Sequence, residues 1–311
     1  MSKSFNMEFK SKDIISINDF SKEELLHIIK IVRQMEQKPK NNLLKGKILA
    51  ALFFEPSTRT RLSFISAMEQ LSGRVIGFST ANVTSIHKGE SLWDTIKMTE
   101  QYADVIVIRH PLEGSARLAA EAASIPVING GDGSNQHPTQ TILDIYTIQK
   151  TKGKLENLHV GIVGDLKYGR TVHSLVIALS HFSPTFYFIA PDELQIPESY
   201  LDELFQKKVK YYKTSDLMRF SKELDLLYVT RIQKERFPEP LEYEKFKGVY
   251  RIDESFLNHV KKDLKIMHPL PRVDEIDKSV DSTEHAVYFE QAANGIPVRK
   301  ALLALVLGKV K

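Results

Sequence analysis

The chain has 311 residues, of which 42% are hydrophobic and 26% charged, with a formal net charge of +4, and it is long enough for two domains that each bury a core. It contains no cysteine, which excludes disulfides, thiolate chemistry and the usual ligands of a structural zinc. The small basic excess forms no polybasic tail, and no apolar run approaches membrane-spanning length, so we expect a cytoplasmic protein that binds neither nucleic acid nor a membrane.

Short apolar runs alternate with longer amphipathic stretches along almost the whole chain. The run 48–54 predicts a buried strand, and apolar residues follow it at helical spacing up to Gly73. Uniformly apolar strands that alternate with helices are typical of parallel sheets covered on both faces, so the predicted fold class is α/β. Further strands are predicted at 75–78, 105–108, 126–129, 159–163, 186–189, 209–212, 224–229 and 264–267, with helices between most of them, for example at 91–102, 114–123, 138–150 and 169–182.

About nine predicted strands can form one large sheet or two smaller ones, and we favour two. The polar, lysine-rich stretch 149–159 marks the boundary. We therefore expect two doubly wound parallel-sheet domains, 1–149 and 150–290, with the active site in the cleft between them. Residues 291–311 include a strongly apolar helix that is expected to pack back on the first domain.

The stretch FFEPSTRTRLSF, residues 53–64, follows the first strand and opens a helix. A loop after a parallel strand lies at the carboxyl edge of the sheet, where open α/β folds bind ligands. The first backbone N–H groups of the helix, its hydroxyls and the Arg59 guanidinium together suit a doubly charged oxyanion. The hydroxyls belong to Ser57, Thr58 and Thr60. The alternative is that Ser57 is a simple N-cap and the arginines are solvated.

Two more motifs place polar side chains after apolar strands. Arg109 and His110 end the run VIVIRH, although an arginine that only snorkels at a strand end is an equal alternative. In GGDGSNQHPTQTILD, residues 130–144, His137 and Gln140 lie on one face at a helix N-terminus. His137 could polarise a carbonyl oxygen or be an ordinary capping residue. No second histidine or carboxylate stands at ligand spacing, so we expect neither a metal nor another cofactor.

The second half of the chain repeats this pattern. Residues 161–174 have glycines at 161, 164 and 169, which do not match the dinucleotide fingerprint G-x-G-x-x-G and disfavour a nicotinamide oxidoreductase. What remains there is a strand and a turn, with Arg170 near a helix start. Arg231, Gln233 and Arg236 follow another apolar strand.

Two prolines, Pro269 and Pro271, bracket Leu270 in a loop after the last strand. They rigidify this loop and aim the backbone carbonyls between them. With strand-end arginines in both halves of the chain, two facing domains would each hold one anion. This arrangement fits a group transfer between two anionic substrates better than hydrolysis or redox chemistry.

The sequence resembles the catalytic chains of the aspartate carbamoyltransferase family in motifs that run in order over essentially its whole length: FEPSTRTRLSF, VIVIRHP, GDGSNQHPTQTILD, VGDLKYGRTVHSL, TRIQKER and HPLPRVDEI. The tetrapeptide S-T-R-T is shared across carbamoyltransferases, so the second-half motifs indicate the acceptor. Ornithine-using relatives carry a cysteine-containing loop where this chain has HPLPR. The resemblance implies that carbamoyl phosphate and L-aspartate give N-carbamoyl-L-aspartate and phosphate, the committed step of pyrimidine synthesis.

The resemblance also implies a role for each matching residue. The catalytic residues would be Arg59, Thr60, Arg109, His137 and Lys88. Carbamoyl phosphate would be bound by these five together with Ser57, Thr58, Ser85, Gln140, Pro269 and Leu270. Aspartate would be bound by Lys88, Arg170, Arg231, Gln233 and Leu270. Domain closure would involve Glu55, Arg170 and Arg236, whereas physics alone also allows Glu55 to be a helix N-terminal carboxylate.

The stretch NVTSIHKGESLWDT matches the mobile loop with which the family completes the active site of a neighbouring subunit. Here the loop would lend Ser85 and Lys88, although without the resemblance both would be assigned to a solvated loop. The resemblance therefore implies an obligate homotrimer with shared sites. The loop is one residue shorter than in some relatives and carries His87, whose function it does not define.

Three alternatives stay open at the level of the sequence. The acceptor could be another amine such as ornithine, and the chain could be a non-catalytic paralogue that retains the fold. The family also occurs as bare trimers, in fusions, and as dodecamers with zinc-containing regulatory chains. The C-terminal stretch YFEQAANGIPVRKALLALVLG favours the forms that take regulatory chains.

Overall fold

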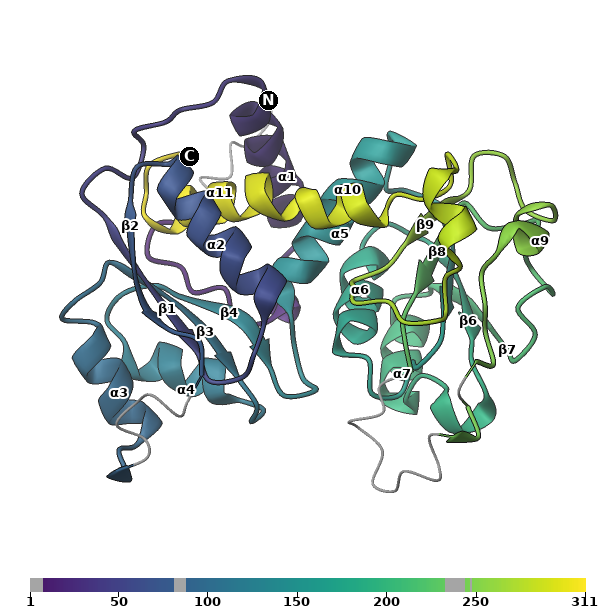
Figure 1. Cartoon of the computed structure of the whole chain (residues 1–311), viewed down its shortest axis with the longest axis horizontal. Coiled ribbons are helices and arrows are strands. Elements are labelled where there is room, and N and C mark those ends of the chain that lie inside the picture. Colours follow the sequence, from purple (N-terminus) through teal and green to yellow (C-terminus); the bar gives the residue numbers. More distant parts are fainter. Residues whose placement is uncertain (1–7, 81–87, 233–243, 247) are drawn as a thin grey trace. The chain divides into compact units, whose positions relative to one another are not determined.

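The computed structural model describes residues 8–80, 88–232, 244–246 and 248–311 and divides into two compact units, which are described separately (Figure 1). One unit comprises Met1–Leu143 with Asn294–Lys311, and the other comprises Asp144–Ala293. The sequence places its boundaries at 149/150 and 290/291, a few residues from these divisions. The assignment of one substrate to each unit, and of a cleft between them, stays a prediction.

The first unit is built on a four-stranded sheet in the order β2-β1-β3-β4. Every paired strand is parallel to its neighbour. The central strands are buried because both of their faces are apolar, whereas the edge strand β2 is largely exposed. The strands are β1 (Ile48–Phe53), β2 (Arg74–Phe78), β3 (Val105–His110) and β4 (Val127–Asp132).

Helices cover both faces of this sheet (Figure 1). The helices α3 (Leu92–Thr99) and α4 (Ser115–Ala122) lie on one face, over a core that includes Leu52 and Ile106. The opposite face carries α2 (Thr58–Gln70), and the C-terminal α11 (Gly295–Val306) packs against both α2 and α1 (Lys22–Gln37).

The second unit is built on a five-stranded parallel sheet in the order β7-β6-β5-β8-β9. One face carries α6 and α7, and the segment 250–288 supplies much of the core on the other face. The predicted α/β class with two parallel sheets is confirmed. The strands are β5 (His159–Val163), β6 (Thr185–Ile189), β7 (Lys210–Thr214), β8 (Leu226–Val229) and β9 (Lys265–Met267), and the helices are α5 (Pro138–Lys152), which enters from the first unit, α6 (Arg170–Ser180), α7 (Glu198–Gln206), α9 (Glu254–Leu257) and α10 (Tyr288–Ala293).

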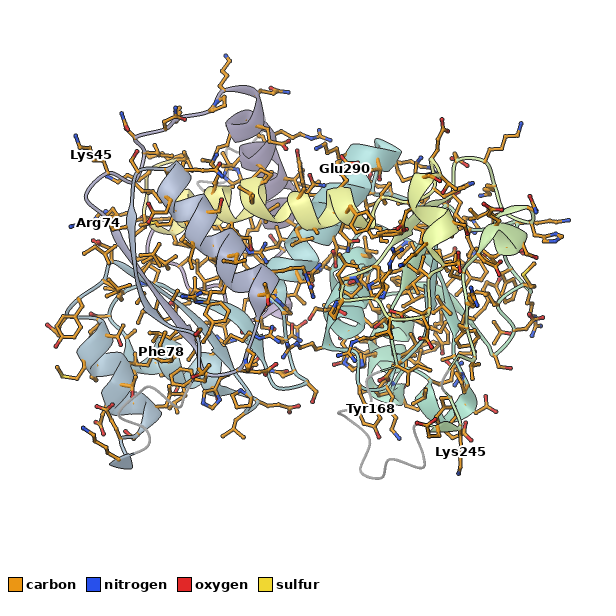
Figure 2. The ribbon with its side chains drawn as sticks, in the orientation of Figure 1. Lys45, Arg74, Phe78, Tyr168, Lys245 and Glu290 are labelled. Atoms are coloured by element: carbon orange, nitrogen blue, oxygen red, sulfur yellow. The ribbon has the colours of Figure 1, made fainter. Side chains whose placement is uncertain are left out.

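Surface elements of both units are held by specific side-chain contacts (Figure 2). Phe78, at the end of β2, packs edge-on against Phe54 with ring centroids 4.9 Å apart. Glu290, on α10, forms an ion pair with Lys150 of α5, with 3.3 Å between Oε1 and Nζ. Within the described part of the chain, no helix is both long and apolar enough to cross a membrane.

The strand order defines one switch point in each sheet. In the first sheet the chain reverses its direction of winding between the neighbours β1 and β3, and in the second between β5 and β8. Loops that leave the carboxyl ends of such strands diverge and leave a crevice in which open α/β folds bind ligands. At the second switch point, Gly164 has φ +119°, and a Cβ there would lie 2.0 Å from the carbonyl oxygen of Thr230. Only glycine therefore allows the two strand ends to approach so closely.

His173 links the stability of the second unit to pH. This residue of α6 is 5% exposed; its Nε2 lies 2.8 Å from the carbonyl oxygen of Leu166, and its ring stacks on Tyr200. Burial lowers the pKa of His173 below its ordinary value of 6.5 and outweighs the hydrogen bond to Leu166, which favours the charged ring. The unfolded chain therefore takes up a proton at higher pH than the folded chain does.

We expect the contribution of His173 to be fully present above about pH 6.5 and to be lost as the pH falls towards the lowered value. Between about pH 7.5 and 5.5, wild type should lose up to about 1.4 kcal/mol per pH unit more unfolding free energy than His173→Gln, which keeps a donor for Leu166. Urea unfolding at a series of pH values measures both slopes. Identical slopes would show that His173 protonates equally in the two states.

Candidate active site

Arg109 is fixed at the switch point of the first sheet. It is in register with Phe53 at the end of β1, so it stands beside the loop that leads into α2. Its Nη2 donates to Glu55 Oε1 at 2.7 Å, and its Nη1 donates to the carbonyl oxygen of Gly130 at 3.2 Å. The side chain is 11% exposed, and its buried Nε has no hydrogen-bond partner within the described residues. Arg109 is thus a held cation rather than a solvated side chain.

The first turn of α2 lacks the cap that its sequence would allow. Ser57 stands at the N-cap with extended backbone, but its side chain makes no capping hydrogen bond, and the first turn holds no acidic residue. By contrast, the N-cap serines Ser21 of α1 and Ser91 of α3 both accept a backbone N–H. Ser57 is thus the N-cap residue by position, but its hydroxyl does not cap α2. The positive end of the α2 dipole therefore faces neither a capping hydroxyl nor an acidic side chain of its own first turn.

The residues after Ser57 divide between solvent and the sheet. Thr58 and Arg59 are exposed, whereas Thr60 is 6% exposed. Thr60 lies against Gly130: its Cγ2 would be 3.6 Å from a Cβ at that glycine. The start of α2 thus packs on β4 at Gly130, the same residue whose carbonyl oxygen accepts from Arg109. Arg59, which has contacts of its own, is the exposed cation of this helix start.

A buried carboxylate, Asp132, fixes the loop between β4 and α5 through four hydrogen bonds. Asp132 accepts hydrogen bonds from the backbone N–H groups of Gly114 and Gln136, at 2.9 and 3.2 Å, and from the side-chain amides of Asn129 and Asn135, at 2.9 and 3.0 Å. It is 1% exposed. These bonds fix the loop that delivers His137, and sequence reasoning did not single out Asp132.

His137 begins α5. Its carbonyl oxygen accepts the backbone N–H groups of Gln140 and Thr141, at 3.0 and 3.2 Å, and Pro138 is the first helical residue. The side chain of His137 is buried, and Gln140 is half-buried one turn into the helix. His137 is therefore the capping position of α5, as one of the two interpretations expects. The backbone carbonyl, and not the imidazole ring, supplies this cap.

His110 is a structural neighbour of Arg109. Its Nδ1 accepts the backbone N–H of Leu112 at 3.0 Å and lies 2.8 Å from Ser115 Oγ, and its ring packs 4.9 Å from Phe54. Burial lowers the pKa of His110 and outweighs the nearby carboxylates of Glu55 and Asp132. The ring is therefore neutral and terminates β3 without offering a charge.

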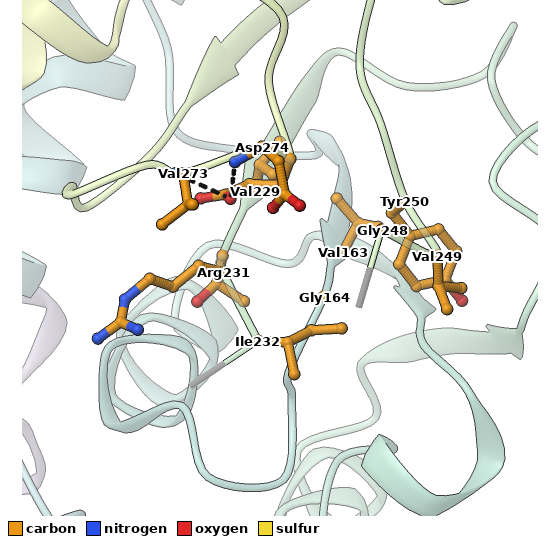
Figure 3. Close-up of a pocket in the computed structure, with 12 residues that line it drawn as sticks. Val163, Gly164, Val229, Arg231, Ile232, Gly248, Val249, Tyr250, Val273 and Asp274 are labelled. Atoms are coloured by element: carbon orange, nitrogen blue, oxygen red, sulfur yellow. Dashed lines mark hydrogen bonds between the residues drawn. The ribbon is translucent and has the colours of Figure 1, made fainter. Parts of the chain in front are cut away.

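In the second unit, Arg170 and Arg231 follow the two strands of the switch point. Arg170 is the first residue of α6, whose N-cap Gly169 has no side chain. Arg231 lies just beyond β8 and lines a pocket of about 50 Å³ with Gly164 and Tyr250. Figure 3 shows its guanidinium extending away from the other labelled lining residues. Arg170 thus lies at a helix start and Arg231 at a strand end, on the connections that leave two adjacent strands.

Pro269 and Leu270 follow β9, the neighbour of β8, and both are half-buried. Leu270 has φ +55°, a left-handed conformation that is unusual for leucine. His268 and Glu275 surround it and are both buried. Sequence reasoning noted the prolines but missed these two residues; the histidine next to a proline pair was the available signal.

Several predicted residues are not brought together by what the structure describes. Ser85, Gln233 and Arg236 lie outside the described residues, and Lys88 is exposed at the edge of that range. Glu55 pairs with Arg109 of its own unit, whereas its expected partners were Arg170 and Arg236. The closure contacts therefore stay a prediction. In the described ranges, no group of three histidine or acidic side chains is placed to hold a metal ion.

Comparisons with known proteins cover both units. The family model "Aspartate/ornithine carbamoyltransferase, carbamoyl-P binding domain" matches residues 12–150, and the model of the Asp/Orn binding domain of the same family matches residues 156–306. The chain is 58% identical over 306 residues to the aspartate carbamoyltransferase catalytic subunit of Thermococcus kodakarensis, covering 97% of this chain and 99% of the relative. It is 51% identical to that of Bacteroides fragilis, with 96% and 97% covered.

Solved structures give the same result. The catalytic subunit of M. jannaschii aspartate transcarbamoylase matches with a TM-score of 0.89 and 52% identity, covering 96% of this chain and 98% of that chain. Aspartate transcarbamoylase from Trypanosoma cruzi, in complex with N-(phosphonacetyl)-L-aspartic acid, matches with a TM-score of 0.91 and 39% identity, covering 96% and 97%.

Proposed function

The chain belongs to the aspartate/ornithine carbamoyltransferase family, and on that premise we propose that it transfers the carbamoyl group of carbamoyl phosphate to L-aspartate. The activity is that of an aspartate carbamoyltransferase, EC 2.1.3.2, an enzyme of pyrimidine biosynthesis. The amine of aspartate forms a bond to the carbamoyl carbon, the bond from that carbon to the phosphate oxygen breaks, and the products are N-carbamoyl-L-aspartate and phosphate. The observation that carries this proposal is the uncapped start of α2 beside the fixed Arg109.

Carbamoyl phosphate would bind at the carboxyl edge of the first sheet. Its phosphate suits the backbone donors of α2, the hydroxyls of Ser57 and Thr58, and the guanidinium of Arg59. Its carbonyl oxygen would lie near Thr60, Arg109 and His137, with Gln140 beside them. The buried Nε of Arg109 supports this assignment, because a buried donor without an acceptor is costly and an anion would satisfy it.

Aspartate would bind at the second switch point. Its two carboxylates suit Arg170 and Arg231, with Gln233 nearby in the chain. The backbone carbonyls of Pro269 and Leu270 would accept hydrogen bonds from the attacking amine and orient it. The adjacency of β5, β8 and β9 in the sheet supports this grouping.

The chemistry needs alignment and charge stabilisation rather than a nucleophilic side chain. A neutral amine attacks a carbonyl carbon, and negative charge develops on the carbonyl oxygen of the tetrahedral intermediate. Arg109, Thr60 and His137 would stabilise that oxyanion, and Arg59 would neutralise the leaving phosphate. The departing phosphate can itself accept the proton of the amine.

The acceptor is tested by presenting amines separately. The purified chain is supplied with carbamoyl phosphate and either L-aspartate or L-ornithine, and both phosphate release and the carbamoylated product are measured. We expect a carbamoylated product with aspartate but not with ornithine. We also expect N-(phosphonacetyl)-L-aspartic acid, which the Trypanosoma cruzi relative binds, to inhibit the reaction. Product with ornithine would indicate the other branch of the family, and no product with either amine would indicate a non-catalytic paralogue.

The assembly is proposed to be a homotrimer in which Ser85 and Lys88 complete the site of a neighbouring subunit. The loop match supports this, as do exposed apolar side chains on the edge strand β2 and on α3, where Ile76 and Trp93 are 41% and 42% exposed. Sedimentation that finds only single chains at assay concentration would contradict it. Association with zinc-containing regulatory chains, which would form a dodecamer, and a cytoplasmic location remain predictions of the sequence.

A further inference from the structure

Two buried side chains, His268 and Glu275, hold the loop after β9 in place, and the proposed chemistry assigns no role to either. We call this pair the clip. His268 and Glu275 are 2% and 7% exposed. The Nδ1 atom of His268 accepts the backbone N–H of Leu270 at 2.8 Å, and its Nε2 lies 2.7 Å from Glu275 Oε1. Because Nδ1 accepts, the ring is neutral and carries its proton on Nε2, which donates to Glu275. One imidazole thus connects the tip of the loop to its far end.

Glu275 closes the loop from the other side. Its Oε2 accepts the backbone N–H groups of Val273 and Asp274, both at 3.1 Å (Figure 3, dashed lines). Burial opposes ionisation of Glu275, but the hydrogen bond from His268 and those from the backbone outweigh it and hold the pKa of the carboxyl below its usual value. The carboxylate is therefore charged at neutral pH and keeps all three donors.

The conformation held in this way is one that leucine does not adopt unaided. Leu270 has φ +55°, a left-handed conformation in which a bulky residue is strained and which persists only where its surroundings impose it. The bond from its N–H to His268 is such a constraint. The left-handed turn at Leu270 sets the directions in which the carbonyl groups of Pro269 and Leu270 point.

The backbone of His268 is anchored to the body of the second unit. The backbone N–H of His268 donates to Gln291 Oε1 at 2.8 Å, and Gln291 Nε2 donates to Asp144 Oδ1 at 2.7 Å. The hydroxyl of Tyr228, on β8, donates to the other oxygen of Asp144 at 3.0 Å. Since all of these groups are buried, the loop is attached to a rigid part of the second unit.

We propose that His268 and Glu275 are positioning residues that hold Leu270 in its left-handed conformation and thereby aim the carbonyl groups of Pro269 and Leu270 at the amine of the acceptor. This inference rests on the proposed function, since it takes aspartate as the acceptor. Neither side chain touches the reacting atoms. They act through the backbone, where a misplacement on the order of 1 Å can cost about 100-fold in rate.

Two amide substitutions at His268 separate its two nitrogen atoms. In His268→Asn the side-chain oxygen can take the place of Nδ1 and accept from Leu270. In His268→Gln the side-chain nitrogen can take the place of Nε2 and donate to Glu275, but nothing replaces Nδ1. We expect His268→Asn to keep kcat within a few-fold of wild type. We expect His268→Gln to lose about tenfold or more in kcat and to raise the KM for aspartate.

Inorganic phosphate serves as the probe of the carbamoyl phosphate site. Its inhibition constant in competition with carbamoyl phosphate should be the same in both variants. His285 provides the matched control, because its Nδ1 contacts the carbonyl oxygen of Leu264 in the same unit at 2.8 Å, away from the loop tip. His285→Gln is expected to leave kcat unchanged. If His268→Gln does not fold, Glu275→Gln tests the clip instead, since its amide NH₂ cannot accept from a backbone N–H, and kcat should again fall.

Equal losses in His268→Asn and His268→Gln would overturn the proposal, because the ring would then act through its volume alone. Unchanged turnover in His268→Gln, or in Glu275→Gln should His268→Gln fail to fold, would overturn it too. Crystal structures of the variants give a reading that is independent of activity: a positive φ at Leu270 in His268→Gln would contradict positioning even in an active enzyme. Failure of wild type to carbamoylate aspartate would refute the proposed function and leave that structural reading intact.

Discussion

Arg59→Ala is expected to lower kcat by about two to three orders of magnitude, the scale of removing one donor from a preorganised anion site. Arg59 is the exposed cation of an α2 start that has no capping side chain and no acidic residue in its first turn. Without it, the start of α2 offers the leaving phosphate backbone donors and hydroxyls but no cation. Steady-state assays of the folded variant with saturating carbamoyl phosphate and aspartate measure the effect.

Arg117→Ala is the matched control, because Arg117 is an exposed arginine of the same unit that pairs with Asp19 at 2.9 Å. Its turnover should equal that of wild type. A folded Arg59→Ala variant with nearly wild-type turnover would refute the assignment. Mixing Arg59→Ala subunits with Lys88→Ala subunits extends the experiment, since hybrid trimers with shared sites would contain one intact site and regain activity.

Arg109→Met is expected to lower kcat about 100-fold or more, because it removes the held cation beside the proposed oxyanion. It should also destabilise the fold by about 2 kcal/mol, since Glu55 loses a charged partner at 2.7 Å and Gly130 loses a donor. Turnover and urea unfolding measure the two effects separately. Methionine preserves most of the side-chain volume in this largely buried position.

The double variant Arg109→Met/Glu55→Gln separates catalysis from stability. Neutralising Glu55 removes the unpaired carboxylate, so part of the lost stability should return. Turnover should stay low, because the cation is still missing. A double variant that recovers wild-type turnover would show that Arg109 acts only by holding Glu55.

Most of the strands were predictable because they are short, largely apolar runs between polar segments. Each of the nine predicted strands is present in the described part of the chain, displaced by no more than a few residues. The prediction of uniform burial is wrong for the edge strands β2 and β7; β2 is largely exposed, and β7 exposes Lys210, Tyr212 and Lys213. Lysines on an edge prevent pairing with another sheet, so the departure has a physical reason.

Helix α1 was not named from the sequence, although its start was marked. Ser21 accepts the backbone N–H of Glu24, and the Glu24 side chain accepts that of Ser21, which is a complete capping box. The motif S-x-x-E is visible in the sequence before an amphipathic stretch. Local chemistry would therefore have been enough to predict α1 without knowledge of the tertiary structure.

The candidate site was only partly predictable. Arginines at strand ends could be identified because parallel strands deliver their carboxyl ends to one edge. The pairing of Arg109 with Glu55 spans 54 residues and depends on the register of β1 and β3, which the sequence does not state. The contact between His268 and Glu275 likewise depends on the path of a loop, so the histidine beside the two prolines marks a position but not its partner.

The unused cap at the start of α2 implies a compromise between folding and recognition. A serine hydroxyl that accepts a helix N–H stabilises a helix by about 1 kcal/mol, and α2 forgoes this although Ser57 stands in the right place. A variant engineered for heat resistance by strengthening this helix end would fill the same donors that the anion needs. A stronger cap would therefore raise thermal stability and lower substrate affinity, because both depend on the backbone N–H groups of the same turn.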